Sequence, residues 1–411
     1  MSHHDVIVVG TGLAGLTAAT RLAEGGARVL VLAKGVGATH LSPCTIDVLG
    51  YAPDRVSDPG AALAGLGEDH PYAAVGRDGV AAAIAWFTDA MRDRYPYTGG
   101  LEHNLLLPTA VGALKPTAVV SETMAAGDGS DPVLVVGFTA LKDFHAPLLA
   151  DNLSRAGITA RAVELDLVPE GRADVNSLGF ARAFDDPAFR AEVAAQLVAR
   201  LGADERVAFP AVLGITDPHR VWTSLEHALG RPVFEVPTLP PSVPGMRVFA
   251  VLRERLRRAG VRVILNAVVG GAERSGGRVS AVRARVGLRE VTYGCGWVVL
   301  ATGGFASGGL ELDSRWQARE RALGLPVSGV PADERFRADY FGEQPMARAG
   351  VAVDRNLRPE GHENVLVAGA TLAGAQPWRE KSGDGISLAT GHRAAELILG
   401  AAVPSEPARA A

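Results

Sequence analysis

Cysteine is scarce in this chain of 411 residues, and its scarcity limits the chemistry that the chain performs alone. The two cysteines, Cys44 and Cys295, lie far apart and have no C-x-x-C partners. Such a chain by itself holds neither an iron–sulfur cluster nor a four-ligand zinc site. The ten histidines show no H-E-x-x-H or H-x-E spacing. We therefore expect no metal site, and two reduced thiols in the cytoplasm.

An excess of one charge and a long apolar run are also missing. Lys and Arg number 41 against 45 Asp and Glu, so the net charge is −4 and gives no basic footprint for nucleic acid. No apolar stretch reaches the length of a membrane span, and residues 1–5 lead into a strand without a signal-type segment. We expect a cytoplasmic protein, at most peripheral to a membrane.

Glycine is abundant at 49 residues while aromatic residues make up 6%, which suits an α/β chain with many tight turns. Its length predicts two domains. The opening of the sequence shows the pattern directly. Residues 6–9 are a buried strand, a glycine-rich turn and an apolar helical face follow, and residues 29–32 are a second strand.

The turn after the first strand has the G-x-G-x-x-G spacing of dinucleotide-binding proteins at Gly10, Gly12 and Gly15. Gly10 permits the tight turn, Gly12 lets the backbone approach a pyrophosphate, and Gly15 lets helix and strand pack closely. The helix begins with Leu13 and Ala14, where free N–H groups and the helix dipole favour a phosphate. The alternative is a tight turn with a structural role only.

Two later glycine sites follow predicted strands. The first comes after the buried stretch 297–301, and the second consists of a strand end and the start of a helix that runs to Leu399. Taken alone, the first of these could be an ordinary turn after a strand. Together with the G-x-G-x-x-G turn, however, the chain has three glycine sites, which indicate a flavin dinucleotide. The cofactor-binding residues predicted here are Thr302, Gly303, Gly304, Gly369, Gly383, Asp384, Gly385, Ile386 and Ser387.

Hydrophobic periodicity predicts further helices and strands in the rest of the chain. Proline-rich residues 235–245 are predicted to form a loop between domains. Strands are predicted over 158–165 and 261–266, with a hairpin of 278–286 and 289–296. Helices are predicted over 81–94, 145–157, 186–202 and 246–260.

Several stretches resemble a known family, the B subunits of anaerobic glycerol-3-phosphate dehydrogenase, within the flavoproteins of the fumarate reductase and succinate dehydrogenase type. These stretches are residues 32–51, 105–117, 141–153, 209–215 and 235–248. The resemblance implies an α/β fold with a Rossmann-like FAD/NAD(P)-binding domain of the glutathione reductase type, fumarate reductase branch. This domain is expected over 1–99 and 245–411, with an inserted α+β substrate or cap domain over 100–244.

The resemblance also implies a flavin. Family B subunits are described with FMN, whereas the three glycine sites of this sequence suit FAD, so we expect FAD with FMN as the alternative. The second strand ends in Lys34, where many nucleotide-binding proteins carry an acid and the succinate dehydrogenase branch tends to have lysine. An ammonium donates hydrogen bonds only, so Lys34 suits a phosphate. An exposed lysine without a ligand is the alternative. His40 falls where the related branch has a histidine bonded to flavin, although hydrogen bonding or stacking is the larger expectation here. Ser42 and Thr45 are expected to hydrogen-bond the flavin.

The implied reaction oxidises sn-glycerol 3-phosphate to dihydroxyacetone phosphate, with electrons passing through flavin towards the quinone pool. A base for the 2-hydroxyl proton and cations for the phosphate are needed. The catalytic candidates are His40, His103, Lys115 and Arg348, and Arg247, Arg379 and Lys381 are further polar residues near the family's stretches.

The resemblance leaves other roles open. It implies a complex with an FAD-bearing A subunit and an iron–sulfur C subunit, so this chain is alternatively a component for electron transfer or a scaffold. A free-standing flavin reductase of the fumarate reductase or ketosteroid dehydrogenase kind is a further alternative.

Overall fold

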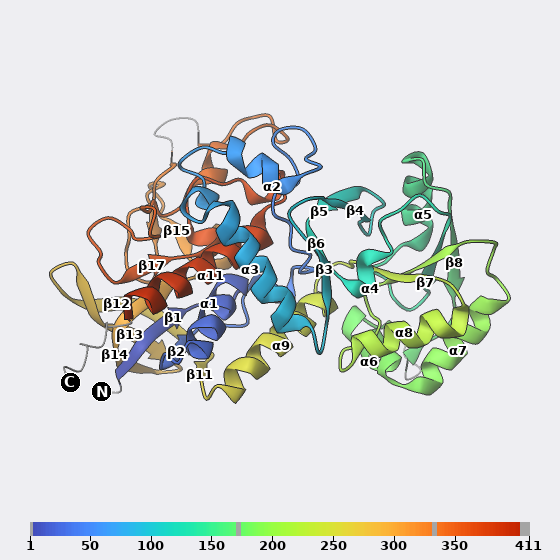
Figure 1. The fold of residues 1–411 in the computed structure, drawn as a ribbon, viewed down its shortest axis with the longest axis horizontal. Coiled ribbons are helices and arrows are strands. Elements are labelled where there is room, and N and C mark those ends of the chain that lie inside the picture. Colours follow the sequence, from blue (N-terminus) through green and yellow to red (C-terminus); the bar gives the residue numbers. More distant parts are fainter. Residues whose placement is uncertain (1–2, 170–173, 331–334, 403–411) are drawn as a thin grey trace, which may run out of the picture.

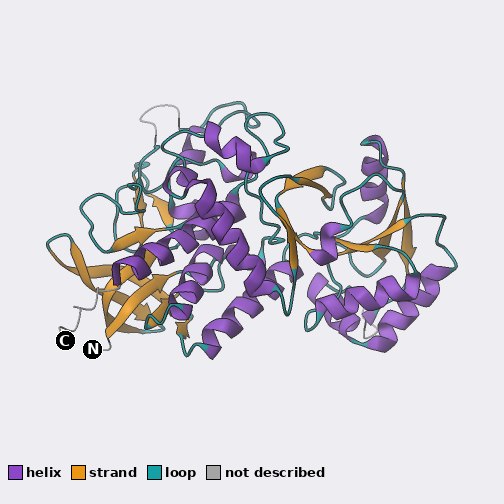
Figure 2. Cartoon of the chain, in the orientation of Figure 1, coloured by secondary structure: helices purple, strands orange, loops and turns teal. Residues whose placement is uncertain are grey.

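The computed structural model describes residues 3–169, 174–330 and 335–402. They form two lobes, which Figures 1 and 2 show side by side. One lobe contains a seven-stranded sheet with α1, α3 and α11, and the other contains a four-stranded sheet with α5 to α8. Two separate clusters of buried side chains match these lobes, one built from residues 6–119 and 248–398 and the other from residues 133–243. The domain boundaries themselves stay a prediction.

The seven-stranded sheet has a parallel centre, because β1 pairs in parallel with both β2 and β14. Strand β14 is a single strand of 12 residues that leaves the antiparallel hairpin and continues into the parallel centre. This single strand replaces the two that are predicted from the sequence, over 289–296 and over the buried stretch 297–301, and β12 is a strand that was not predicted. The strands are β11 (Arg262–Ile264), β2 (Val29–Leu32), β1 (His3–Val9), β14 (Arg289–Leu300), β13 (Arg278–Val286) and β12 (Ala267–Ser275), with β17 (Val365–Val367) beside β14.

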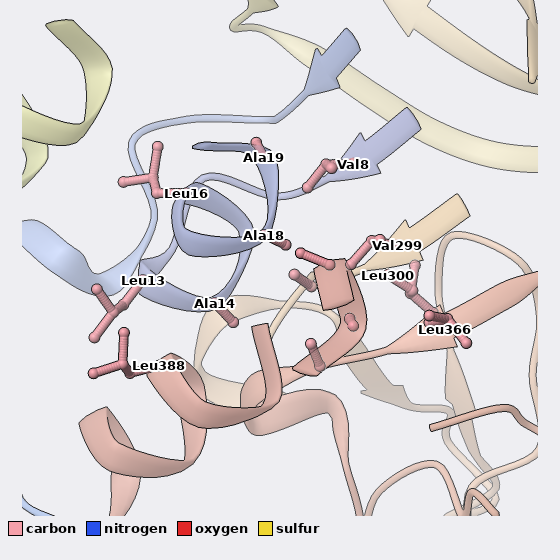
Figure 3. Close-up of a cluster of buried hydrophobic side chains, with 14 of the residues drawn as sticks. Val8, Leu13, Ala14, Leu16, Ala18, Ala19, Val299, Leu300, Leu366 and Leu388 are labelled. Carbon is pink, nitrogen blue, oxygen red and sulfur yellow. The ribbon is translucent and has the colours of Figure 1, made fainter. Parts of the chain in front are cut away.

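Helices α1 and α11 pack together over this sheet because both present small residues at their contact. A Cβ on Gly391 of α11 would lie 2.4 Å from the carbonyl oxygen of Ala14 in α1. Figure 3 shows Leu13 of α1 beside Leu388 of α11, and Leu300 beside Leu366 in the neighbouring strands. The helices of this lobe are α1 (Leu13–Glu24), α2 (Pro59–Ala62), α3 (Gly76–Met91), α9 (Val243–Arg258), α10 (Pro377–Glu380) and α11 (Gly383–Ala402).

The second lobe is built on a wholly parallel sheet in the order β10-β9-β7-β8. Helices connect its strands, so the sheet is of α/β type and not of the α+β type expected of this region, in which the strands would be antiparallel. Its strands are β7 (Val133–Phe138), β8 (Ala160–Leu165), β9 (Arg206–Pro210) and β10 (Val233–Val236), and its helices are α4 (Glu122–Ala125), α5 (Ala146–Arg155), α6 (Ser177–Asp185), α7 (Pro187–Val198) and α8 (Pro218–Leu229).

The remaining strands form antiparallel pairs, β3 (Tyr97–Gly99) with β6 (Val119–Ser121), β4 (Leu105–Pro108) with β5 (Leu114–Thr117), and β15 (Leu310–Leu312) with β16 (Ala318–Glu320). The first two pairs lie between the lobes in Figure 1.

The proline-rich stretch 235–245 is only partly a loop, which corrects our prediction. Its first residues complete β10, and Val243 to Gly245 form the first turn of α9. Proline is compatible with this turn because Pro244 lies where a helix has no intrahelical use for an N–H. Gly245 is required for close packing, since a Cβ there would lie 1.9 Å from the carbonyl oxygen of Thr39.

Candidate functional site

A cavity of about 670 Å³ opens at the carboxyl ends of β1, β2 and β14. This volume lies within the range of about 300–1,000 Å³ that small-molecule and cofactor sites occupy. The carboxyl edge of parallel strands is also where α/β sheets bind nucleotides. The wall combines the β1–α1 turn, the segment after β2, the start of β12, the turns after β14 and β17, and the start of α11.

The first glycine turn of the wall has the geometry that a pyrophosphate requires. Gly10 has φ +117°, and a Cβ there would lie 2.1 Å from the carbonyl oxygen of Ala301. A Cβ on Gly15 would lie 2.2 Å from the carbonyl oxygen of Gly10, whereas a Cβ on Gly12 would have no atom within 4 Å. Gly12 is the N-cap of α1 and no side chain caps the helix. The N-terminus of α1 is therefore open to a ligand, with Leu13 and Ala14 on the wall.

One end of the cavity is cationic. Lys34 lies on the wall directly after Ala33, whose carbonyl oxygen accepts a 2.9 Å hydrogen bond from the N–H of Ala267 at the start of β12. The next residue of β12, Val268, stands opposite Arg285 of β13, which also lines the cavity. Within the described part of the chain, neither Lys34 nor Arg285 has an ion-pair partner. Both cations are therefore available to a phosphate or to the ribose of a nucleotide.

Asp384 and Ser42 also line the cavity. The segment after β2 runs from Lys34 past the β1–α1 turn, where a Cβ on Gly37 would lie 2.7 Å from the amide nitrogen of Gly12, before it reaches Ser42. Asp384 and Ser42 are therefore placed at the other end, beyond this turn. The Ser42 hydroxyl donates a 2.5 Å hydrogen bond to Oδ2 of Asp384, and accepts a 3.0 Å bond from the N–H of Cys44. Burial raises the pKa of Asp384 to about 6, and the negative charge of Asp47 adds to this shift, while the Ser42 bond and Lys115 oppose it. The pKa of this carboxyl therefore lies well above that of an ordinary aspartate.

The glycines around this end have mixed roles. Thr302, Gly303 and Gly369 lie on the wall, where Gly303 donates its N–H to the Thr371 hydroxyl at 2.9 Å. Gly385, one of the predicted cofactor-binding residues, does not present a free N–H, because that N–H donates to the carbonyl oxygen of Asp47 at 3.1 Å. The start of α11 reaches the cavity through Asp384 and Ser387 instead.

Other predicted cofactor residues lie behind the wall rather than on it. Gly15 and Gly385 permit close packing, and Ile386 is buried in the core. The full set off the wall is Gly15, His40, Thr45, Gly304, Gly383, Gly385 and Ile386.

The His40 ring packs edge-on against Phe249 of α9, with ring centroids 4.7 Å apart. Its Nε2 is buried and has no hydrogen-bond partner among the described residues, and burial lowers its pKa, so the ring is neutral. The neighbours of His40, Thr39, Leu41 and Ser42, form the cavity wall in its place. The expected bond or stacking between this ring and a flavin therefore has no support from its position.

Lys115 of β5 belongs to a polar cluster next to the Asp384 end. Its Nζ lies 2.8 Å from Oδ2 of Asp47 and donates to the Thr45 hydroxyl at 2.7 Å. The Thr45 hydroxyl in turn lies 3.0 Å from Oδ1 of Asp47. The Lys115 and Asp47 side chains are only 18% and 13% exposed. This cluster links the β4–β5 hairpin to the segment that lines the cavity.

The remaining catalytic candidates do not converge on the cavity. His103 is exposed on a loop, and Arg348 lies 3.4 Å from the carboxylate of Glu343. Arg247 is fully buried and held by Glu235 at 2.6 Å, so it has a structural role instead of binding a phosphate. Lys381 donates to the carbonyl oxygen of Trp378, and Arg379 is exposed on α10.

Sequence reasoning missed part of the wall, namely Thr11, Val268, Val269, Arg285, Ser307, Gly308, Gly309 and Arg321. The glycines after Gly304 were a usable signal, since a Cβ on Gly309 would lie 2.1 Å from the carbonyl oxygen of Gly303. The contribution of β12 and β13 had no local signal, because it depends on where the hairpin folds back.

Among the described residues, no group of three or more His, Cys, Asp or Glu side chains could hold a metal ion. No helix in the same part of the chain is both long and apolar enough to cross a membrane.

Comparison with known proteins gives consistent results. Residues 5–386 match the family described as FAD binding domain. The chain is 35% identical to the B subunit of a probable anaerobic glycerol-3-phosphate dehydrogenase from Halobacterium salinarum, over 95% of this chain and 96% of that one. It is 32% identical to the B subunit of the anaerobic glycerol-3-phosphate dehydrogenase from Pectobacterium atrosepticum, over 96% and 98% of the two chains. A flavocytochrome c3 fumarate reductase in its open conformation is similar over 98% of this chain and 79% of its own, with 10% identity and a TM-score of 0.45.

Proposed function

Because the chain belongs to the family of anaerobic glycerol-3-phosphate dehydrogenase B subunits, with an FAD-binding domain over most of its length, we propose that it binds FAD in the cavity described above. The bound flavin supplies the two-electron chemistry. The protein then works as a flavoprotein component in the oxidation of sn-glycerol 3-phosphate to dihydroxyacetone phosphate, and electrons pass towards the quinone pool.

The observation that carries this proposal is the open cradle at Gly12. The uncapped N-terminus of α1 faces a cavity that continues in both directions, to Lys34 and Arg285 at one end and to Asp384 and Ser42 at the other. A dinucleotide fits this arrangement better than a mononucleotide, since its pyrophosphate lies between two large ring systems. FMN has one ring system and one phosphate, so it would occupy only one of the two ends of the cavity.

The test is to purify the protein, measure flavin absorbance per chain, and release the cofactor with acid for chromatography. FAD at about one per chain is expected. A colourless protein that takes up neither FAD nor FMN on reconstitution would contradict the proposal. FMN alone would retain the flavin assignment and refute the dinucleotide.

A second candidate role is electron transfer without substrate oxidation on this chain. The specific observation in its favour is that Lys115 is engaged by Asp47 and Thr45, while His103 and Arg348 lie off the cavity wall. Among the described residues, none of the four catalytic candidates therefore lies on the cavity wall. A steady-state assay of the isolated chain with glycerol 3-phosphate, fumarate and an artificial acceptor separates the roles. Turnover of glycerol 3-phosphate supports oxidation here, turnover of fumarate supports a free-standing reductase, and no turnover supports electron transfer.

A further inference from the structure

We infer that Asp384 is a proton-holding carboxylate that sets the reduction potential of the bound flavin, and that Asp47 and Lys115 control its charge. This inference rests on the proposed function, because it requires a flavin in the cavity. It assigns a role in tuning the cofactor to residues that have none so far.

The position of Asp384 supports this role. Of the described residues on the cavity wall, it is the one carboxylate, against the cations Lys34, Arg285 and Arg321. Lys34 follows β2, where dinucleotide-binding proteins hold the ribose. The chain passes from Lys34 over the β1–α1 turn at Gly37 before Ser42 meets Asp384, so Asp384 lies on the far side of the turn from Lys34. The flavin ring system therefore belongs to the Asp384 end. The 2.5 Å bond from Ser42 fixes the carboxylate there.

The groups facing Asp384 divide into charged and neutral ones. Asp47 and Lys115 are the charged pair, joined at 2.8 Å. The Glu380 carboxylate, 3.2 Å from Nε2 of His70, is a further negative neighbour of Tyr72. Burial raises the pKa values of the other titratable neighbours, so they stay neutral, and these are Cys44, Tyr72 and Tyr97.

Charge on Asp384 and charge on the flavin oppose each other. Reduction places negative charge on the flavin, and a nearby ionised carboxylate makes that charge less favourable. Reduction therefore raises the pKa of Asp384 above its value with oxidised flavin. At a pH between these two pKa values, the carboxylate takes up a proton when the flavin is reduced. Below the lower of the two pKa values the residue is neutral and has no effect. Above the higher one it lowers the potential by a constant amount.

The test is a potentiometric titration of the flavin-loaded protein between about pH 5 and pH 9, with Asp384→Asn as the main variant. We expect the two proteins to have equal potentials at the acid end. At the alkaline end the variant should have the higher potential, by at least about 30 mV, which is a tenfold change in the ratio of affinities for reduced and oxidised flavin. Equal potentials across the whole range would overturn the inference.

Two further variants act on Asp384 from a distance and in opposite directions. Lys115→Met leaves the negative charge of Asp47 uncompensated, which raises the pKa of Asp384. The pH above which the flavin potential falls below that of the Asp384→Asn protein should therefore rise. Asp47→Asn removes a negative charge, so the same pH should fall. A merely structural role for the cluster would not move this pH in opposite directions. Shifts of one sign, or no shift, would refute the part assigned to Asp47 and Lys115.

A measurement on the apoprotein tests the proton-holding role of Asp384 independently of whether the Asp384→Asn variant retains flavin. Because the folded-state pKa of Asp384 is raised from 3.8 to about 6, the folded protein holds this proton more tightly than the unfolded chain. Urea unfolding of the apoprotein should show wild type losing stability relative to Asp384→Asn as pH rises from about 4 to about 6, with no further change above. A constant difference would remove the proton-holding role. A protein that binds no flavin under any condition refutes the proposed function itself, which is a different result.

Discussion

Gly12 is the residue on which the cavity depends most directly. Its φ of −67° and ψ of 175° are open to any residue, so glycine is not needed there for backbone conformation. Nor is it needed for packing, since its Cβ would have no atom within 4 Å. Gly10 and Gly15 differ, because a Cβ on either would collide with backbone. What Gly12 provides is free space on the wall of the cavity.

We predict that Gly12→Val folds normally and loses its flavin. The added methyl groups would occupy the space of the pyrophosphate and remove charge-assisted hydrogen bonds worth about 1.5–3 kcal/mol each. Flavin absorbance after reconstitution measures the loss, and circular dichroism and urea unfolding check the fold. The matched control is Gly270→Val, at an exposed position of β12 that also has no atom within 4 Å of its Cβ and does not line the cavity. Full occupancy in Gly12→Val would mean that the turn is structural only.

At the scale of elements, the start of α11 is held against the segment that follows β2. The N–H of Gly385 donates to the carbonyl oxygen of Asp47, and the Tyr72 hydroxyl donates to that of Val48 at 2.9 Å. A Cβ on Gly385 would lie 2.6 Å from the Asp47 oxygen and 2.4 Å from the Tyr72 hydroxyl. These contacts place Asp384 on the cavity wall.

Gly385→Ala is therefore expected to displace the start of α11, at a cost of about 1–3 kcal/mol in the free energy of unfolding. The flavin should also bind more weakly, because Asp384 and Ser387 move with the helix. Gly383→Ala is the matched control two residues away, where the nearest atom is the Pro377 Cβ at 3.4 Å, and it should change neither property. Urea unfolding and a flavin titration decide. Equal effects from the two variants would contradict this account of the helix position.

At the scale of the whole molecule, a buried ion pair joins β10 of the second lobe to α9 of the first. Arg247 and Glu235 are 1% and 0% exposed, and their side chains meet at 2.6 Å and 2.9 Å. The other guanidinium donors reach the carbonyl oxygen of Gly214 and the Tyr95 hydroxyl, so every donor is used.

Arg247→Met should destabilise the protein by about 3–5 kcal/mol, because it leaves the Glu235 carboxylate buried without its partner. Adding Glu235→Gln should recover part of this loss. The control Arg257→Met, in an exposed pair with Glu254, should have no measurable effect on urea unfolding. If Arg247→Met alone proves as stable as wild type, then the two lobes are held together by other contacts.

We also predict that the protein functions as one subunit of a complex. The relatives reported above are named as B subunits of a dehydrogenase, and the proposed reaction delivers electrons to membrane quinone. Affinity purification from the native host in mild detergent should recover an FAD-bearing A subunit and a cysteine-rich C subunit. Recovery of this chain alone, with full turnover of glycerol 3-phosphate, would instead indicate a self-sufficient dehydrogenase.

Local patterns in the sequence were enough to predict the βαβ opening and to propose a nucleotide site beside it. The spacing of Gly10, Gly12 and Gly15 depends on one turn and one helix, so no distant residue is needed to interpret it. The same holds for α5, α7 and β8, whose observed bounds lie close to the predicted ones. The stretches that carry the family resemblance, such as 105–117 and 235–248, can likewise be identified without a structure.

Tertiary structure alone decided which polar residues meet. Ser42 and Asp384 are 342 residues apart in sequence, and Lys115 reaches Asp47 across 68 residues. Arg285 approaches the strand end at Lys34 only because β12 begins beside Ala33 and β13 folds back along it. Conversely, the place of His40 in the chain suggested a flavin ligand, but its ring packs on Phe249. Charge and hydrogen bonding act over a few ångströms in space, and sequence patterns report only neighbours along the chain or on one element.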